Sequence, residues 1–219
     1  DDVFRKLERT YDIDIFSNFI EDGVSVSYEI KKQALVEVQF KVFASNLSSK
    51  EDCIKIDVII KNLTEKPHNY TIKTVFDTLL GEASKNHFFT NKINPLNTEQ
   101  LFEGMSEQRY VASTNGYDTV GFLLYGNNMA EPEFVCVGNR DTLLQKLWIP
   151  NIVQNKTFDS IDTFNNSALS IIWRPVELSS LNKSTTTFFI STATDKRAFP
   201  LEKSFPVEML TYAPALEED

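Results

Sequence analysis

The sequence has few cysteines, glycines and prolines and no long apolar run, and each shortage argues against a class of protein. Its two cysteines, Cys53 and Cys136, lie far apart in 219 residues, so they give no spacing signature of a disulfide framework, and whether they pair stays open. The 7 glycines and 8 prolines are spread along the chain, which argues against a fibrous or disordered class. No apolar stretch approaches the roughly 18 residues of a membrane-spanning helix, so we expect no membrane span in this chain.

Positive charge is also in short supply. The chain has 22 Lys and Arg against 31 Asp and Glu, a formal net charge of -9. Such a surface repels a phosphate backbone, so we expect no nucleic-acid partner. An acidic exterior suits a basic protein partner instead.

Apolar and polar residues alternate with period two over four consecutive segments, residues 23–30, 35–43, 53–60 and 70–76. Period-two alternation indicates strands with one buried face. The short connections between them are rich in Asn, Ser, Pro and Asp, which favour turns. These four segments predict an antiparallel meander.

Further segments indicate a nearly all-β chain. Strands are expected at 119–125, 133–137, 168–173, 185–192 and 207–212, with weaker patterns at 11–16 and 109–113. Short helical turns are expected at 1–9, at 97–104 and at 140–148, the last with Asp141 as its N-cap. None of these turns can cover a sheet, so two antiparallel sheets must bury each other's apolar faces. The predicted fold is a two-sheet β-sandwich in one domain, residues 1–219.

The loop after the fourth strand contains the densest group of candidate site residues: Asp77, Glu82, His87 and Glu99. Carboxylates suit Ca²⁺, but the spacing of an EF-hand loop is missing, and no HxH, HExxH or CxxC pattern points to zinc. We therefore expect neither a metal nor a cofactor. The alternative is structural: Asp77 ends a strand, Gly81 supplies a positive φ, and His87 packs the loop onto the sandwich.

Aromatic residues give a second group of candidates. Trp148, Tyr110 and Tyr117 could stack on sugar rings, with Asn139 as a hydrogen-bonding neighbour. Trp173 ends an alternating strand, which favours a place in the core. Both histidines lie in expected loops, and no GxSxG or GK[ST] pattern occurs, so no catalytic residues are predicted.

Several short stretches resemble a β-sandwich domain that recurs in bacterial cell-envelope proteins, particularly its spirochaete versions. They are "VFDTLLGE" with its DTxLG-like turn, "HFFT", "VCVGNRDTLLQKLW", and "NNSALSIIWRPVEL" with its NNSAxxxxW pattern. The resemblance covers about residues 20–195 and extends, more remotely, to the supersandwich of the galactose-mutarotase type. It implies an exported domain, periplasmic or at the cell surface, which could be a fragment of a larger envelope protein. The paired catalytic histidines of mutarotases have no counterpart here, which argues against an epimerase.

Three functions follow in order of preference. The first is a non-enzymatic envelope module that holds a protein partner, in a motility or wall-associated assembly, through loops 78–104 and 138–165. The second is a carbohydrate-binding module that uses Trp148 and its aromatic companions. The third is a glycan-active enzyme that uses Asp77, Glu82 or His87.

Overall fold

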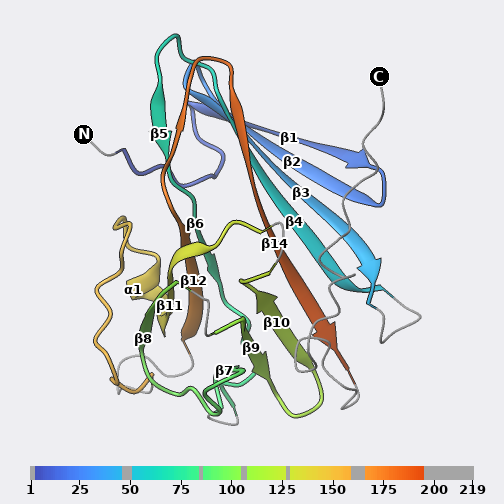
Figure 1. The fold of residues 1–219 in the computed structure, drawn as a ribbon, viewed down its shortest axis with the longest axis vertical. Helices are drawn as coiled ribbons and strands as arrows, with labels where there is room; N and C mark the ends of the chain where they lie inside the picture. The colour runs from blue at the N-terminus through green and yellow to red at the C-terminus, as the bar shows by residue number, and fades with distance from the viewer. Residues whose placement is uncertain are drawn as a thin grey trace.

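The computed structural model describes residues 3–45, 51–83, 86–104, 108–126, 129–158 and 166–194. These residues form antiparallel sheets and one short helix (Figure 1). The large sheet contains, in spatial order, β1 (Ile13–Ile20), β2 (Gly23–Ile30), β3 (Ala34–Ala44), β4 (Glu51–Asn62), β14 (Lys183–Ala193), β10 (Thr119–Leu123), β9 (Tyr110–Thr114) and β7 (Phe89–Thr90). The small sheet contains β6 (Lys73–Phe76), β12 (Ser167–Trp173), β11 (Pro132–Asn139) and β8 (Gln100–Glu103), and a third ladder pairs β13 (Val176–Leu178) with β5 (His68–Tyr70). The expected antiparallel β-sandwich is confirmed.

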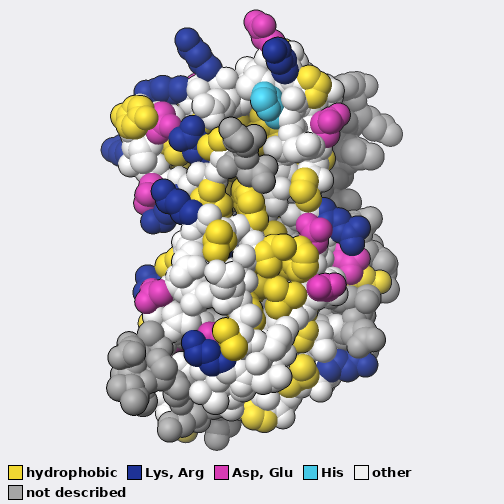
Figure 2. Space-filling view, turned by 90° about the vertical axis from the view of Figure 1, so that its left-hand side faces the viewer, with side chains coloured by type: hydrophobic (Ala, Val, Ile, Leu, Met, Phe, Trp, Pro, Cys, Tyr) yellow, Lys and Arg dark blue, Asp and Glu magenta, His cyan; other side chains and the backbone are white. Residues whose placement is uncertain are grey.

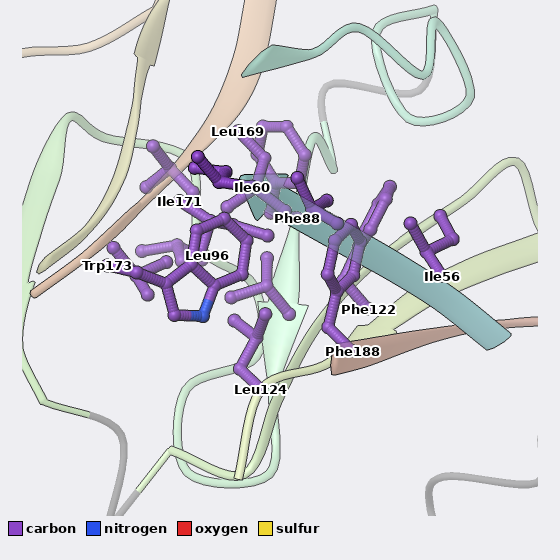
Figure 3. Close-up of a cluster of buried hydrophobic side chains, with 14 of the residues drawn as sticks. Ile56, Ile60, Phe88, Leu96, Phe122, Leu124, Leu169, Ile171, Trp173 and Phe188 are labelled. Carbon is purple, nitrogen blue, oxygen red and sulfur yellow. The ribbon is translucent and has the colours of Figure 1, made fainter. Parts of the chain in front are cut away.

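The core lies between the large and small sheets. Trp173 of β12 packs on Phe188 of β14, with 5.2 Å between the ring centroids and the rings tilted. The ring centroids of Phe76 in β6 and Phe122 in β10 are 4.7 Å apart, so aromatic rings from the two sheets are in contact. Figure 3 shows Trp173, Phe122 and Phe188 among the buried apolar side chains of this cluster. Every second residue of each strand contributes to this core, because successive side chains of a strand point to opposite faces of the sheet.

The predicted meander is correct for three of its four strands. β2, β3 and β4 pair in order, and β1 extends the same meander at its outer side. The fourth segment, 70–76, does not pair with β4. It divides into the end of β5 and all of β6, and β6 joins the small sheet while β14 takes the place beside β4.

The predicted helical turns are mostly wrong. Residues 97–104 contain β8, which pairs with β11, and the described residues 3–9 form no helix. Within the described ranges only α1 (Arg140–Leu143) is helical, and its N-cap is Asn139, not Asp141. No described helix has the length and hydropathy to cross a membrane. The expected strand at 207–212 lies outside the described residues.

The two cysteines lie on opposite outer sides of the sandwich, so they cannot form a disulfide within the chain. Cys53 alternates with the core residues of β4, and Cys136 packs under Leu143 of α1 on the outer side of the small sheet. Both are free and buried. Burial raises the pKa of each thiol to about 12. Both therefore stay protonated and unreactive at neutral pH.

Candidate functional site

Polar residues from three segments meet at one end of the small sheet. β6 and β11 both run antiparallel to β12, so the ends of β6 and β11 lie beside the start of β12. The residues that follow or precede these strands are therefore neighbours. They are Asp77 after β6, Arg140 and Asp141 after β11, and Asn166 before β12, and we call these four residues the polar edge.

Hydrogen bonds and one ion pair connect the polar edge. Arg140 Nε lies 3.4 Å from Asp77 Oδ2, and the backbone N–H of Arg140 donates to the carbonyl of Asn166 at 2.7 Å. The Asn166 amide donates to Asp141 Oδ2 at 3.2 Å. Asp77, Arg140 and Asp141 are exposed and Asn166 is half-buried. Carboxylate acceptors, guanidinium donors and an amide are thus presented to solvent in a connected array.

A buried hydrogen-bonded chain lies directly behind the polar edge. The Ser167 backbone N–H donates to Glu82 Oε1 at 2.9 Å, and its hydroxyl lies 3.4 Å from the same oxygen. His87 Nδ1 lies 2.8 Å from the Ser167 hydroxyl oxygen. Glu82 is 6% exposed and His87 is 3% exposed, and the imidazole packs edge-on against Phe158. We call Glu82, Ser167 and His87 the buried relay.

The order of groups in the buried relay determines its chemistry. In a nucleophilic Ser-His-acid triad the imidazole lies between the hydroxyl and the carboxylate. Here the serine lies between the carboxylate and the imidazole. A protonated Nδ1 can donate to Ser167 while the hydroxyl donates to Glu82, so the chain is suited to fixing or passing a proton rather than to forming an acyl-serine.

Glu99 and Asn139, two further predicted site residues, belong to the same end of the small sheet but have structural contacts. Glu99 precedes β8 and is buried, and its carboxylate accepts the backbone N–H of Val153 at 3.0 Å and lies 3.8 Å from Lys156 Nζ. It therefore ties the loop after α1 to the sheet. The Asn139 side chain accepts the N–H of Asp141 at 3.0 Å, which is the helix cap.

The loop that follows β6 contains Asp77, Glu82 and His87, three of the predicted site residues. The prediction that Gly81 in this loop has a positive φ is wrong. Gly81 does not adopt a positive φ; the positive value in this turn belongs to Leu79, at 57°. A Cβ on Gly81 would lie 2.1 Å from the carbonyl oxygen of Asn86, so glycine is required by close backbone approach. His87 and Phe88 are both buried, in keeping with the structural alternative for this loop.

The aromatic candidates do not form one site. Tyr110 is 4% exposed and packs edge-on against Phe89 on the large sheet. Tyr117 is exposed in the connection between β9 and β10. Trp148 follows α1 and packs against Phe4 with 5.0 Å between ring centroids. Figure 2 shows hydrophobic side chains gathered on the side of the molecule that lies at left in Figure 1, where α1 is seen. Tyr110, in β9 of the large sheet, and Tyr117, in the turn that follows β9, belong to another part of the molecule.

Arg140, Asn166 and Ser167 were not among the predicted site residues. The residues that they contact in the site are distant in the sequence. Ser167 and Glu82, for example, are 85 residues apart. The available signal was the run "NNSA" at the start of an alternating strand. Among the described residues, no group of three or more His, Cys, Asp or Glu side chains lies close enough together to hold a metal ion.

Comparison with known proteins shows similarity in fold. No family model and no curated protein matches the sequence. A galactose mutarotase related enzyme from Lactobacillus acidophilus matches with a TM-score of 0.51 and 7% identity, over 85% of this chain and 73% of that chain. A galactose mutarotase-like protein from Lactobacillus casei matches with a TM-score of 0.46 and 9% identity, over 84% of this chain and 74% of that chain.

The similarity to the Lactobacillus acidophilus enzyme corrects one prediction, and several others stay predictions. The prediction that the chain is not an enzyme is wrong, because its sandwich resembles that of a galactose mutarotase related enzyme. The predicted scaffold role in a motility or wall-associated assembly gains no support. Export to the periplasm or cell surface stays a prediction. The chain has a sandwich fold similar to that of a galactose mutarotase related enzyme.

Proposed function

We propose that this chain recognises a carbohydrate at the polar edge. The observation that carries the proposal is the connected array of Asp77, Arg140, Asp141 and Asn166 at the end of the small sheet. A sugar presents neighbouring hydroxyls that both donate and accept, and carboxylate, guanidinium and amide groups match them in pairs. The buried relay anchors Ser167, the residue next to Asn166, from behind the array. The fold it shares with a galactose mutarotase related enzyme is further support.

Binding can be measured by isothermal titration calorimetry with a panel of aldoses, galactose and glucose among them. Arg140→Ala removes the guanidinium of the array, and we expect it to weaken the binding of the preferred sugar by about tenfold, as for one charge-assisted hydrogen bond. Lys31→Ala is the matched control, because Lys31 lies in the turn between β2 and β3 and pairs with Asp14 of β1, away from the polar edge. Equal affinity in both variants, or no sugar binding by the unmodified chain, would contradict the proposal.

A second candidate is proton transfer on the bound sugar, which the buried relay favours. Interconversion of aldose anomers requires a base that removes the proton of the O1 hydroxyl and an acid that protonates the ring oxygen, with both transfers reversed on ring closure. Glu82 and His87 are groups of these two kinds, and Ser167 links them just behind Asn166.

Polarimetry of freshly dissolved α-galactose tests this second candidate. We expect the chain to accelerate mutarotation and Glu82→Gln to abolish the acceleration, because the amide cannot accept a proton. Asp14→Asn, on β1 of the large sheet, should leave the acceleration intact. Absence of acceleration by the unmodified chain would remove this candidate and leave sugar recognition to be judged by calorimetry.

A further inference from the structure

A second apolar cluster lies on the outer face of the large sheet, which points away from the small sheet. Its side chains alternate along their strands with those of the central core, as Phe189 of β14 alternates with Phe188. Leu123 of β10 is paired in register with Phe189 on one side and with Tyr110 of β9 on the other, so the cluster is continuous across the sheet. We call it the outer patch, and its residues are Phe43, Phe89, Tyr110, Ala112, Leu123 and Phe189.

The outer patch is buried, although no described strand or helix lies over it. Phe189 is 5% exposed and Leu123 is 2% exposed, whereas Phe16, on the same face of the sheet at β1, is 52% exposed. The small sheet packs on the opposite face. Among the described apolar residues outside the strands, only Met129 packs against the patch, and one side chain cannot shield residues of five strands. The burial therefore requires a further apolar cover.

Residues 195–219, which lie outside the described part of the chain, continue directly from this patch. β14 carries Phe189, and its last residue, Ala193, packs against the patch itself. The stretch 205–212, "FPVEMLTY", is rich in apolar residues and has a single charged residue. The eleven residues that end at Phe205 can span about 35 Å at about 3.3 Å per residue, and the patch from β3 to β9 is about 20 Å wide at about 4.8 Å per strand. The apolar stretch can therefore reach every part of the patch.

We propose that residues 195–219 of this chain cover the outer patch, with the apolar side chains of residues 205–212 packed against it. A segment of the same chain is held near the patch by β14, so its effective concentration there exceeds that of a second copy or of another protein in solution. The cover removes apolar side chains of five strands from water, and this removal stabilises the contact. It also shields a surface that, if left bare, would favour association with other molecules. The outer patch and the polar edge belong to different sheets, so the cover is independent of the proposed sugar site.

Cys53 is a natural reporter of this cover. It lies on the same face in β4, opposite Phe43 in register, and is 3% exposed. Alkylation of the full chain with iodoacetamide at mildly alkaline pH, followed by mass spectrometry of its peptides, gives the labelling rate of each cysteine. We expect Met209→Glu with Leu210→Glu to raise the rate at Cys53 by at least about tenfold, because a charged segment leaves the apolar patch and the thiol then meets water. Cys136, buried under α1 on the outer side of the small sheet, should be labelled as slowly as before.

Phe19→Glu with Val153→Glu is the matched control, since it adds the same two charges at exposed apolar residues outside the outer patch. It should leave both cysteines protected. Circular dichroism of each variant confirms that the fold is retained. A variant that unfolds labels Cys136 as well, and in that case Met209→Ser with Leu210→Ser makes the same test by a milder change.

Two results would overturn the proposal. One is a folded variant of the segment in which Cys53 stays as protected as in the unmodified chain. The other is protection of Cys53 that falls when the unmodified chain is diluted, because the cover would then be a second copy rather than residues 195–219.

Discussion

Trp173→Ala is expected to lower the free energy of unfolding by about 3–5 kcal/mol, the usual cost of removing a buried aromatic side chain. Trp173 is 3% exposed and packs on Phe188, so its loss opens a cavity between the two sheets. The indole N–H also donates to the carbonyl of Ala130 at 3.3 Å, and that acceptor loses its partner. Urea denaturation followed by circular dichroism measures the change.

Trp148→Ala is the matched control for this prediction. Trp148 is half-buried and packs mainly on Phe4, outside the core between the sheets. We expect its replacement to cost about 1 kcal/mol, in proportion to the smaller apolar area that it buries. Equal losses in the two variants would contradict the assignment of Trp173 to the central core.

The longer strands of the large sheet could be predicted because one face of each is buried, whereas the two-residue β7 was missed. Alternation over 23–30 matches β2, and alternation over 35–43 and 53–60 lies within β3 and β4. Buried and exposed residues alternate with period two whatever partner the strand has. The same fact explains the error at 70–76, because the pattern says which face is buried but not which strand lies alongside. β6 pairs with β12, almost a hundred residues later in the chain.

The helical turns failed for a related reason. Residues 100–103 fit one turn of helix by local preference, but their backbone pairs with β11, and tertiary pairing overrides weak local propensity. The cap of α1 was misplaced by two residues, since Asn139 and Asp141 are both good capping residues. The structure distinguishes them, because Asn139 has an extended backbone and its side chain accepts the N–H of Asp141.

The candidate site was predicted in part. Asp77, Glu82 and His87 were chosen because acids and a rare histidine cluster in one loop, and the structure places all three at the same end of the small sheet. Arg140 and Ser167 were missed because their role depends on strand pairing between distant segments. The aromatic candidates lie far from one another because aromatic residues are used to fill the core throughout a sandwich. Tyr110, which packs against Phe89, is an example.

Glu82→Ala is expected to lower the free energy of unfolding by about 3 kcal/mol. The change leaves the buried backbone N–H of Ser167 without its carboxylate acceptor, and an unpaired buried donor costs about 1–3 kcal/mol. Loss of the packed side-chain carbons adds to this cost, because each buried methylene contributes about 0.8 kcal/mol. Thermal and urea unfolding of the purified variant measure the sum.

Two further variants separate the buried hydrogen bonds from other effects of removing an acid. Glu82→Gln keeps an oxygen that can accept from Ser167, so it should retain most of the stability that Glu82→Ala loses. Asp141→Ala removes an exposed carboxylate of the polar edge, and exposed groups contribute little, so we expect a loss below about 1 kcal/mol. If Glu82→Gln were as unstable as Glu82→Ala, the negative charge itself would be required behind the polar edge. If all three variants were equally stable, Glu82 would not anchor the start of β12, and the polar edge would lack the rigid support on which the proposed sugar site depends.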